Sequence, residues 1–393
     1  MRNKRNDVVS SAVARPTRAQ KPASRQGEPP KREAQNRAPA RRAAPSARLL
    51  RPRPAPAPER EVASREVSGG VRAIARLVRP SRVLRVWTLK AAIQKAISLA
   101  PASHRVNYLF QRYVTGGVEL NERFLDDRLT HLRSHLKGYR EIASRPHPRS
   151  TLELGTGWYP VVPVALFLAG AETIHTVDIT PLTTRERILA TVDALLERHR
   201  SGRLSEYLFV HPERARALEA LRADADGLSG DALLERLGVR LLVTDARDLP
   251  LADGTVDLIH SNNTFEHVPP AILASILSEF DRVAAPGSVQ SHFIDMSDHF
   301  AHLDKSITIY NYLRFSERAW KLIDNDVQPQ NRLRYADYRR MYDELGLPVV
   351  REFHRPGDVA ALQSVPLHRR YRDRDPAELA ISHCHLYSAP ASA

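Results

Sequence analysis

Two glycines and one acid, spaced along residues 151–178, form the pattern in this chain best suited to hold a nucleotide. Gly155 and Gly157 follow the short apolar run 151–154, and Asp178 ends a second run that begins at residue 173. Glycine lets the backbone turn tightly and approach a ligand closely, whereas a carboxylate accepts hydrogen bonds from ribose hydroxyls. Asp178 lies 21 residues after Gly157, which is where a nucleotide-binding α/β unit places such an acid. The spacing therefore predicts a strand, a glycine turn, a helix and a second strand.

Polar residues also follow the later apolar runs of the chain. Asp245 follows the run 240–244, the pair Asn262 and Asn263 follows 256–260, and Asp295 follows 288–294. The carboxyl ends of parallel strands meet at one edge of a sheet, and ligands bind there. We therefore expect these side chains and the glycine turn to surround a single ligand site.

Strands and helices must alternate along the chain to bring these residues together. The predicted strands cover 151–154, 173–178, 240–244, 256–260, 288–294, 349–353 and 380–387. Such alternation predicts an α/β fold with a doubly wound, mostly parallel sheet of seven strands. Helical periodicity over 86–140 predicts a helical cap at 83–148, and residues 181–238 predict a helical insertion within the ligand-binding domain 149–393.

The positive charge of the chain is concentrated in residues 1–82. They hold 21 Lys or Arg and 6 Asp or Glu, a net charge of +15, whereas the whole chain carries +14. This segment is rich in Pro, Ala and Arg and buries little apolar surface, so we predict a disordered tail. A solvated extension, a transit peptide and a segment that binds nucleic acid through counterion release all fit its composition.

Cysteine content and hydropathy indicate where the chain resides. Cys384 is the only cysteine, which excludes an intrachain disulfide and favours a reducing, cytoplasmic location. The longest apolar run, 161–171, is too short to cross a bilayer, so we expect no membrane span. The sequence gives no indication of oligomeric state.

These motifs resemble the class I S-adenosylmethionine-dependent methyltransferases over roughly residues 150–295. Residues 153–157 resemble the first motif of that family, Asp178 its ribose-binding acid, and 245–246 the pair that contacts adenine. The resemblance implies a Rossmann-like methyltransferase fold and S-adenosylmethionine as cofactor. The cofactor-binding residues it implies are Glu153, Gly155, Gly157, Asp178, Asp245, Ala246 and Asn262.

Two departures from the family pattern narrow the interpretation. Tyr159 stands where the family often has a third glycine, and Pro160 stands where a dinucleotide fingerprint needs glycine, which disfavours a dehydrogenase. The stretch 157–160, with 298–300 and 331–334, also resembles methyltransferases associated with bacterial saccharide biosynthesis. We therefore expect O-methylation of a sugar-like or other small polar metabolite. The alternatives are a nucleic-acid methyltransferase that uses the basic tail and a non-catalytic nucleotide-binding scaffold.

Methylation of a hydroxyl benefits from a general base, and three residues beyond the strand ends are candidates for it. They are His267, Asp298 and His299. Each also has a structural alternative: His267 could bond to backbone at a helix end, and Asp298 and His299 could contact substrate or lie at the surface. Residues 295–304 hold two His and three Asp, but their spacing defines no complete shell of metal ligands. The sequence therefore assigns no metal ligand.

Overall fold

The computed structural model describes residues 86–98, 119–302, 304–325 and 328–389. All of them belong to one compact unit, Arg76–Ala393. The predicted tail 1–82 and residues 99–118 of the predicted cap lie outside the described residues.

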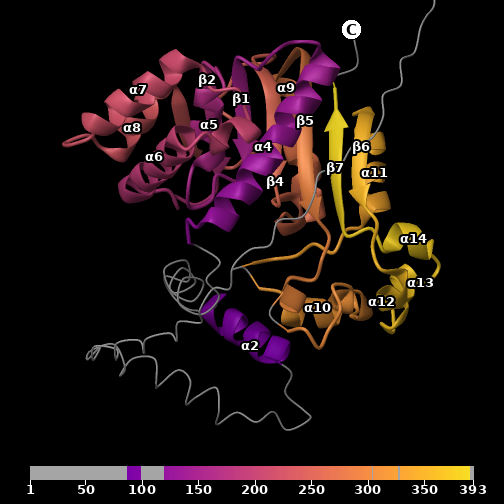
Figure 1. The fold of residues 1–393 in the computed structure, drawn as a ribbon. Helices are drawn as coiled ribbons and strands as arrows, with labels where there is room; N and C mark the ends of the chain where they lie inside the picture. The colour runs from indigo at the N-terminus through magenta and orange to yellow at the C-terminus, as the bar shows by residue number, and fades with distance from the viewer. Residues whose placement is uncertain (1–85, 99–118, 303, 326–327, 390–393) are drawn as a thin grey trace, which may run out of the picture. The chain divides into compact units, whose positions relative to one another are not determined.

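A seven-stranded sheet forms the centre of the described unit, in the order β3-β2-β1-β4-β5-β7-β6 (Figure 1). The four neighbouring pairs among the first five strands are parallel, whereas β7 runs antiparallel to both β5 and β6. The predicted α/β architecture with seven strands is thus confirmed, and β7 makes the sheet mixed rather than purely parallel. The strands are β1 (Ser150–Leu154), β2 (Thr173–Asp178), β3 (Val239–Val243), β4 (Val256–Asn262), β5 (Ala284–Asp295), β6 (Val349–Arg355) and β7 (His383–Ser388).

Helices cover both faces of the sheet because its strands are apolar on both sides. One hydrophobic core joins Leu258 and Val289 of the sheet to α4 (Glu122–Ala143), α5 (Val161–Leu168) and α6 (Arg185–Arg200). A second core on the opposite face joins Leu152 and Leu154 to α9 (Pro270–Val283) and α11 (Tyr335–Glu344). Residues 181–238 contain the helices α6, η2 (Arg203–Glu206), α7 (Pro212–Ala223) and α8 (Gly230–Arg236).

Helix α4, part of the predicted cap, packs along the face of the sheet (Figure 1). Asn121 caps its first turn by accepting a hydrogen bond from the Phe124 N–H at 2.9 Å. Its leucines 125, 129, 132 and 136 recur at three- and four-residue spacing and are buried against the sheet. The buried Arg198 of α6 donates to the Glu122 carboxylate at 2.6 Å, which ties α6 to the start of α4.

A third core lies in the segment that follows β5. Helix α2 (Val86–Ser98) packs there. The backbone N–H of Trp87 donates to Asp304 Oδ2 at 3.0 Å, and the centre of the Trp87 ring lies 6.0 Å from that of the Phe300 ring. Tyr310, Tyr312 and Trp320 are buried in the same core, so these aromatic side chains build structure. The short helices of this region are η4 (His299–His302), η5 (Asn311–Arg314), α10 (Glu317–Ile323), α12 (Val359–Gln363), α13 (Arg369–Arg372) and α14 (Pro376–Leu379).

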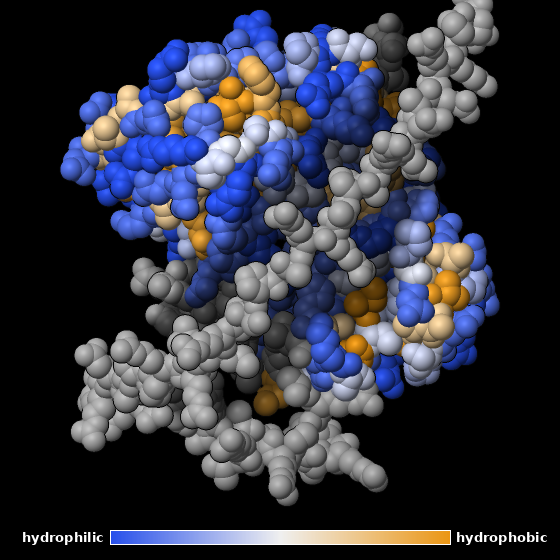
Figure 2. Space-filling model, viewed as in Figure 1, coloured by the Kyte–Doolittle hydropathy of each residue, from blue (hydrophilic) through white to orange (hydrophobic). Residues whose placement is uncertain are grey.

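No helix in the described part of the chain has the length and hydropathy needed to span a membrane. On the face shown in Figure 2, most of the described surface is hydrophilic, and hydrophobic residues gather in small separate groups.

Candidate active site

The glycine loop follows β1 and has the backbone geometry that its sequence predicts. Gly155 has a φ of +88° and Gly157 a φ of +67°, both in the left-handed region that favours glycine. A Cβ added at Gly155 would lie 2.6 Å from Thr264 Oγ1, so the loop packs tightly against the segment after β4. A Cβ at Gly157 would meet no atom within 4 Å. Gly157 therefore borders open space from which a ligand can approach the backbone.

Asp178 lies beside this loop at the end of β2. Its carboxylate accepts a hydrogen bond from the Gly157 N–H at 3.1 Å and another from the Thr180 N–H at 3.1 Å. Thr183 completes the loop by donating its hydroxyl to the Gly157 carbonyl at 3.1 Å. Each carboxylate oxygen has more than one lone pair, so Asp178 can fix the loop and still accept hydroxyl hydrogen bonds.

Glu153 is buried within the sheet beside the glycine loop. Its carboxyl group accepts a hydrogen bond from Thr176 Oγ1 at 3.2 Å, and burial raises its pKa to about 8. Glu153 is therefore neutral near pH 7. The predicted contact of Glu153 with the cofactor stays a prediction.

Asp245 and Ala246 follow β3 in different environments. Arg247 donates to both oxygens of Asp245, and these hydrogen bonds lower the pKa of the carboxyl group to about 2. Ala246 is buried in the core beneath, with Leu249. The Asp245 carboxylate is thus already paired, and an adenine contact at this pair stays a prediction.

Asn262 ends β4 and is tied to α4 by a contact that the sequence did not indicate. Its Oδ1 accepts a hydrogen bond from His135 Nε2 at 2.9 Å, and His135 Nδ1 lies 2.6 Å from Ser291 Oγ. Asn262 is buried, and its Nδ2 has no hydrogen-bond partner among the described residues. A buried donor without a partner is costly, so this amide is a suitable contact for a bound ligand.

The structure brings His267 and His299 together, as the common position after neighbouring strands suggests. His267 belongs to η3 (Phe265–His267) and His299 begins η4, and their ring centres are 5.1 Å apart. The Nδ1–H of His267 donates to the Pro329 carbonyl at 2.6 Å, which leaves the lone pair on Nε2. Burial and the neighbouring His299 lower the pKa of His267 to about 4, so the ring is neutral near pH 7.

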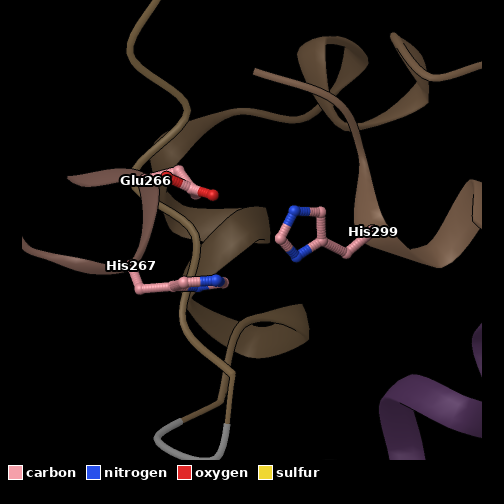
Figure 3. Close-up of side chains that lie close together, drawn as sticks. All are labelled: Glu266, His267 and His299. Carbon is pink, nitrogen blue, oxygen red and sulfur yellow. The ribbon is translucent and has the colours of Figure 1, made fainter. Parts of the chain in front are cut away.

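Sequence reasoning gave Glu266 no role, but its carboxyl group faces the two imidazoles (Figure 3). Burial and the nearby charge of Asp295 raise its pKa well above the ordinary glutamate range. The strand order could have predicted that Glu266 lies near the two histidines. The chain places Glu266 and His267 after β4 and His299 after β5, and these strands are neighbours in the sheet.

Asp298, the third predicted base, holds its own loop together. It is fully buried and accepts hydrogen bonds from the Phe300 N–H at 2.8 Å and from Asn311 Nδ2 at 3.2 Å. Burial raises its pKa to about 6 against the effect of these donors. A base role for Asp298 stays a prediction, and its contacts indicate a structural role.

A cleft of about 420 Å³ lies between α4 and strands β6 and β7. The residues that line this cleft include His131, Lys137, Phe293, Arg351 and His383. None of the predicted site residues lines it. The candidate active site therefore rests on the strand-end residues described above and not on this cleft.

Comparison with known proteins agrees with these strand-end motifs. Residues 202–290 match the family model of a methyltransferase domain. This stretch, less than half of the chain, is therefore similar to a methyltransferase domain. The matched part includes Asp245, Ala246, Asn262 and His267, whereas the glycine loop and Asp178 precede it. The match to this family implies S-adenosylmethionine as the cofactor.

A curated relative and several solved structures are similar to this chain. An uncharacterized methyltransferase of Synechocystis sp. is 29% identical over 121 residues, which cover 30% of this chain and 51% of that protein. The chain therefore spans about half the length of that relative. The PH0226 protein of Pyrococcus horikoshii is 13% identical with a TM-score of 0.40, covering 72% of this chain and 98% of that one. A SAM-dependent methyltransferase of Leishmania major is 15% identical with a TM-score of 0.35, covering 77% and 82%.

Proposed function

We propose that this protein transfers a methyl group from S-adenosylmethionine to a hydroxyl of a sugar-like or other small polar metabolite. The observation that carries the proposal is the junction of the glycine loop with Asp178, where the Gly157 N–H donates to the carboxylate at 3.1 Å. In the proposed complex, Asp178 would accept hydrogen bonds from the ribose beside the open backbone of Gly157. The family match of residues 202–290, which follows this junction in the chain, supports the proposal.

The residues present fit the cofactor. Gly157 borders open space, Asp178 keeps acceptor capacity, and the buried Asn262 Nδ2 has no partner among the described residues. When bound, S-adenosylmethionine supplies a methyl group that its positively charged sulfur already activates. The protein then has to bind and orient the acceptor, exclude water and accept the hydroxyl proton.

The residues after β4 and β5 indicate which group accepts the hydroxyl proton and how polar the methylated substrate is. His267 carries a lone pair on Nε2, because its Nδ1–H is bonded to Pro329, and His299 lies beside it. Glu266 and Asp295 add carboxyl groups to the same region. Such a polar, hydrogen-bonding surface suits an acceptor rich in hydroxyl groups better than an apolar one.

The test is an acceptor screen with the full-length protein and S-adenosylmethionine. Free sugars, polyols, DNA and RNA are the acceptors, and the readouts are S-adenosylhomocysteine formation and the mass gained by the acceptor. We expect turnover with a small polyhydroxy acceptor and none with nucleic acid. Turnover with nucleic acid alone would replace this proposal by the nucleic-acid methyltransferase, and no turnover with any acceptor would favour the non-catalytic scaffold.

The same screen tests the base. If His267 accepts the proton, His267→Ala should lower the rate about 10²–10⁴-fold and leave the affinity for S-adenosylmethionine nearly unchanged. His211→Ala is the control, because His211 is a half-buried histidine of the insertion, paired with Glu213. Wild-type turnover in His267→Ala, Asp298→Ala and His299→Ala would exclude base catalysis from all three positions.

A further inference from the structure

Glu266, His267 and His299 form a compact cluster of metal-ligating side chains at the carboxyl edge of the sheet (Figure 3). One donor atom from each residue lies within 4.8 Å of the other two. Glu266 and His267 belong to η3 after β4, and His299 begins η4 after β5. Two imidazoles and one carboxyl group therefore meet from neighbouring strand ends.

Glu266 has no partner that would explain its burial. Its side chain is only 3% exposed, and neither carboxyl oxygen has a hydrogen-bond partner among the described residues. Native structures rarely leave a buried carboxyl group without partners, because the lost hydration is not replaced. A bound cation would supply what this carboxyl group lacks.

One loop orients both histidines. Pro329 O lies 2.6 Å from Nδ1 of His267, and Gln328 Nε2 lies 3.2 Å from Nδ1 of His299. The bond to Pro329 leaves the lone pair of His267 on Nε2, where it can serve as ligand. Gln328 Nε2 donates to Nδ1 of His299, so this ring carries its proton on Nε2. Ligation through Nε2 of His299 therefore requires the Gln328 amide to turn, so that its oxygen accepts from Nδ1–H. Metal-ligating histidines have outer partners of this kind, which fix the orientation of the ring. Asp295 adds negative charge, with its Oδ2 3.6 Å from Nε2 of His299.

We propose that Glu266, His267 and His299 bind one first-row divalent transition-metal cation, of the class of Zn²⁺, Fe²⁺ and Mn²⁺. Imidazole nitrogen together with carboxylate oxygen suits these cations, whereas Mg²⁺ and Ca²⁺ prefer oxygen ligands alone. Ligand distances of about 2.1 Å place neighbouring donors roughly 3.4 Å apart, so donor atoms that lie up to 4.8 Å apart must approach by up to about 1.4 Å. Three protein ligands leave a coordination position open to a water or an acceptor oxygen.

The role of this cation in turnover, unlike its binding, rests on the proposed function. A hydroxyl oxygen in the open position would lose its proton to solvent more readily, because the cation lowers the pKa of a bound hydroxyl. The oxygen then has the free electron pair that forms the new bond to the methyl carbon, while the bond from that carbon to the sulfur of S-adenosylmethionine breaks and S-adenosylhomocysteine leaves. In this arrangement His267 is a ligand, and its Nε2 does not accept the proton.

The test measures metal binding in the full-length protein without cofactor or acceptor. The protein is dialysed against a chelator and then titrated calorimetrically with Zn²⁺ alone, and with Co²⁺ while its visible absorption is recorded. We expect one equivalent of either cation, with a Co²⁺ spectrum typical of nitrogen and oxygen ligands. Glu266→Gln, His267→Ala and His299→Ala should each weaken binding at least about tenfold.

His302→Ala is the matched control, because its ring lies 5.4 Å from that of His299 but is not part of the cluster. This variant should bind Zn²⁺ as the wild type does, and Zn²⁺ should raise the unfolding temperature of both. Wild-type protein that binds neither cation, or cluster variants that keep wild-type affinity, would overturn the proposal. Preferential binding of Mg²⁺ at the cluster would do the same.

Two further measurements keep the result unambiguous. Thermal unfolding in the presence of chelator reports whether each variant is folded. If a histidine variant does not fold, the metal site is tested with Glu266→Gln, which keeps the side-chain size, and with the Co²⁺ spectrum of the wild type. A separate titration with S-adenosylmethionine tests the proposed function. Binding of Zn²⁺ without binding of S-adenosylmethionine would uphold the metal site and reject methyl transfer. Binding of S-adenosylmethionine without binding of Zn²⁺ would uphold the cofactor of the proposed function and reject the metal site.

Discussion

Asp178 combines two tasks at the end of β2, since it fixes the glycine loop and offers acceptor oxygens to a ribose. We predict that Asp178→Ala weakens S-adenosylmethionine binding at least about tenfold, because charge-assisted hydrogen bonds contribute about 1.5–3 kcal/mol each. Isothermal titration calorimetry measures this change. Asp226→Ala, at an exposed acid of the insertion, should bind as the wild type does. Equal affinity in the Asp178 variant would show that another residue binds the ribose.

Gly155 and Gly202 both have a positive φ, but they differ in what an added side chain would contact. Gly155→Ala should destabilise the protein by about 1–3 kcal/mol more than Gly202→Ala in urea unfolding. Both substitutions carry the left-handed penalty, of about 1–2 kcal/mol. Only the first places a Cβ 2.6 Å from Thr264 Oγ1, whereas Gly202 has open space. Equal losses in the two variants would mean that the loop can shift away from Thr264.

Local spacing was enough to predict part of the site, since Gly155, Gly157 and Asp178 lie near one another in sequence and along two adjacent strands. It could not predict that Arg247 pairs with Asp245, or that Asp298 bonds to its own loop, because these contacts depend on side-chain rotamers. Nor could spacing reveal the partnerless carboxyl group of Glu266, since only tertiary packing removes it from water.

At the scale of elements, buried histidines lie on both faces of the sheet: His135, His260 and His385 on the side of α4, and His292 against Phe280 of α9. His135 of α4, His260 of β4, His292 of β5 and His385 of β7 all have a lowered pKa because burial disfavours the charged imidazole, and for His135 the pKa falls to about 3. The unfolded chain takes up protons at these residues below about pH 6.5, whereas the folded chain does not. Stability should therefore be greatest above pH 6.5 and should fall as the pH is lowered.

His260 offers the sharpest test of these buried histidines. Both ring nitrogens are buried without hydrogen-bond partners among the described residues. His135 packs beside the ring of His260, and His135 and His292 are the titratable groups that add to the lowering of its pKa. His260→Leu should therefore fold at pH 7, and its stability should fall less steeply with acidification, by up to about 1.4 kcal/mol per pH unit below pH 6.5. Urea unfolding at pH 7 and pH 5 compares the two proteins. An unchanged slope would show that His260 is not a buried neutral imidazole.

The helix α4 illustrates how far the sequence could predict an element. Helical periodicity over 86–140 predicts this helix because that signal is local, and the structure adds the cap at Asn121. Its position on the face of the sheet depends on contacts with residues far along the chain, such as the bond from His135 to Asn262. The seven strands could also be predicted from local signals, because most of them are short apolar runs. The alternation of strands with helices then constrains their order in the sheet.

At the scale of the whole molecule, residues 1–82 carry nearly all the net charge but little apolar surface. We predict that deleting them leaves the thermal unfolding of the remaining chain unchanged and keeps turnover on a small acceptor within a few-fold of the full-length value. Differential scanning calorimetry and the acceptor assay measure both. A lower unfolding temperature would contradict the predicted independence of the tail, and a salt-sensitive loss of substrate binding would favour a nucleic-acid substrate.

Cofactor choice is the central claim of this account, and one calorimetric experiment tests it directly. Full-length protein is titrated with S-adenosylmethionine and, separately, with NAD. The glycine loop with Tyr159 and Pro160 in place of further glycines, and with Asp178 beside it, predicts binding of S-adenosylmethionine at one site and no binding of NAD. Tight binding of NAD without binding of S-adenosylmethionine would contradict the account.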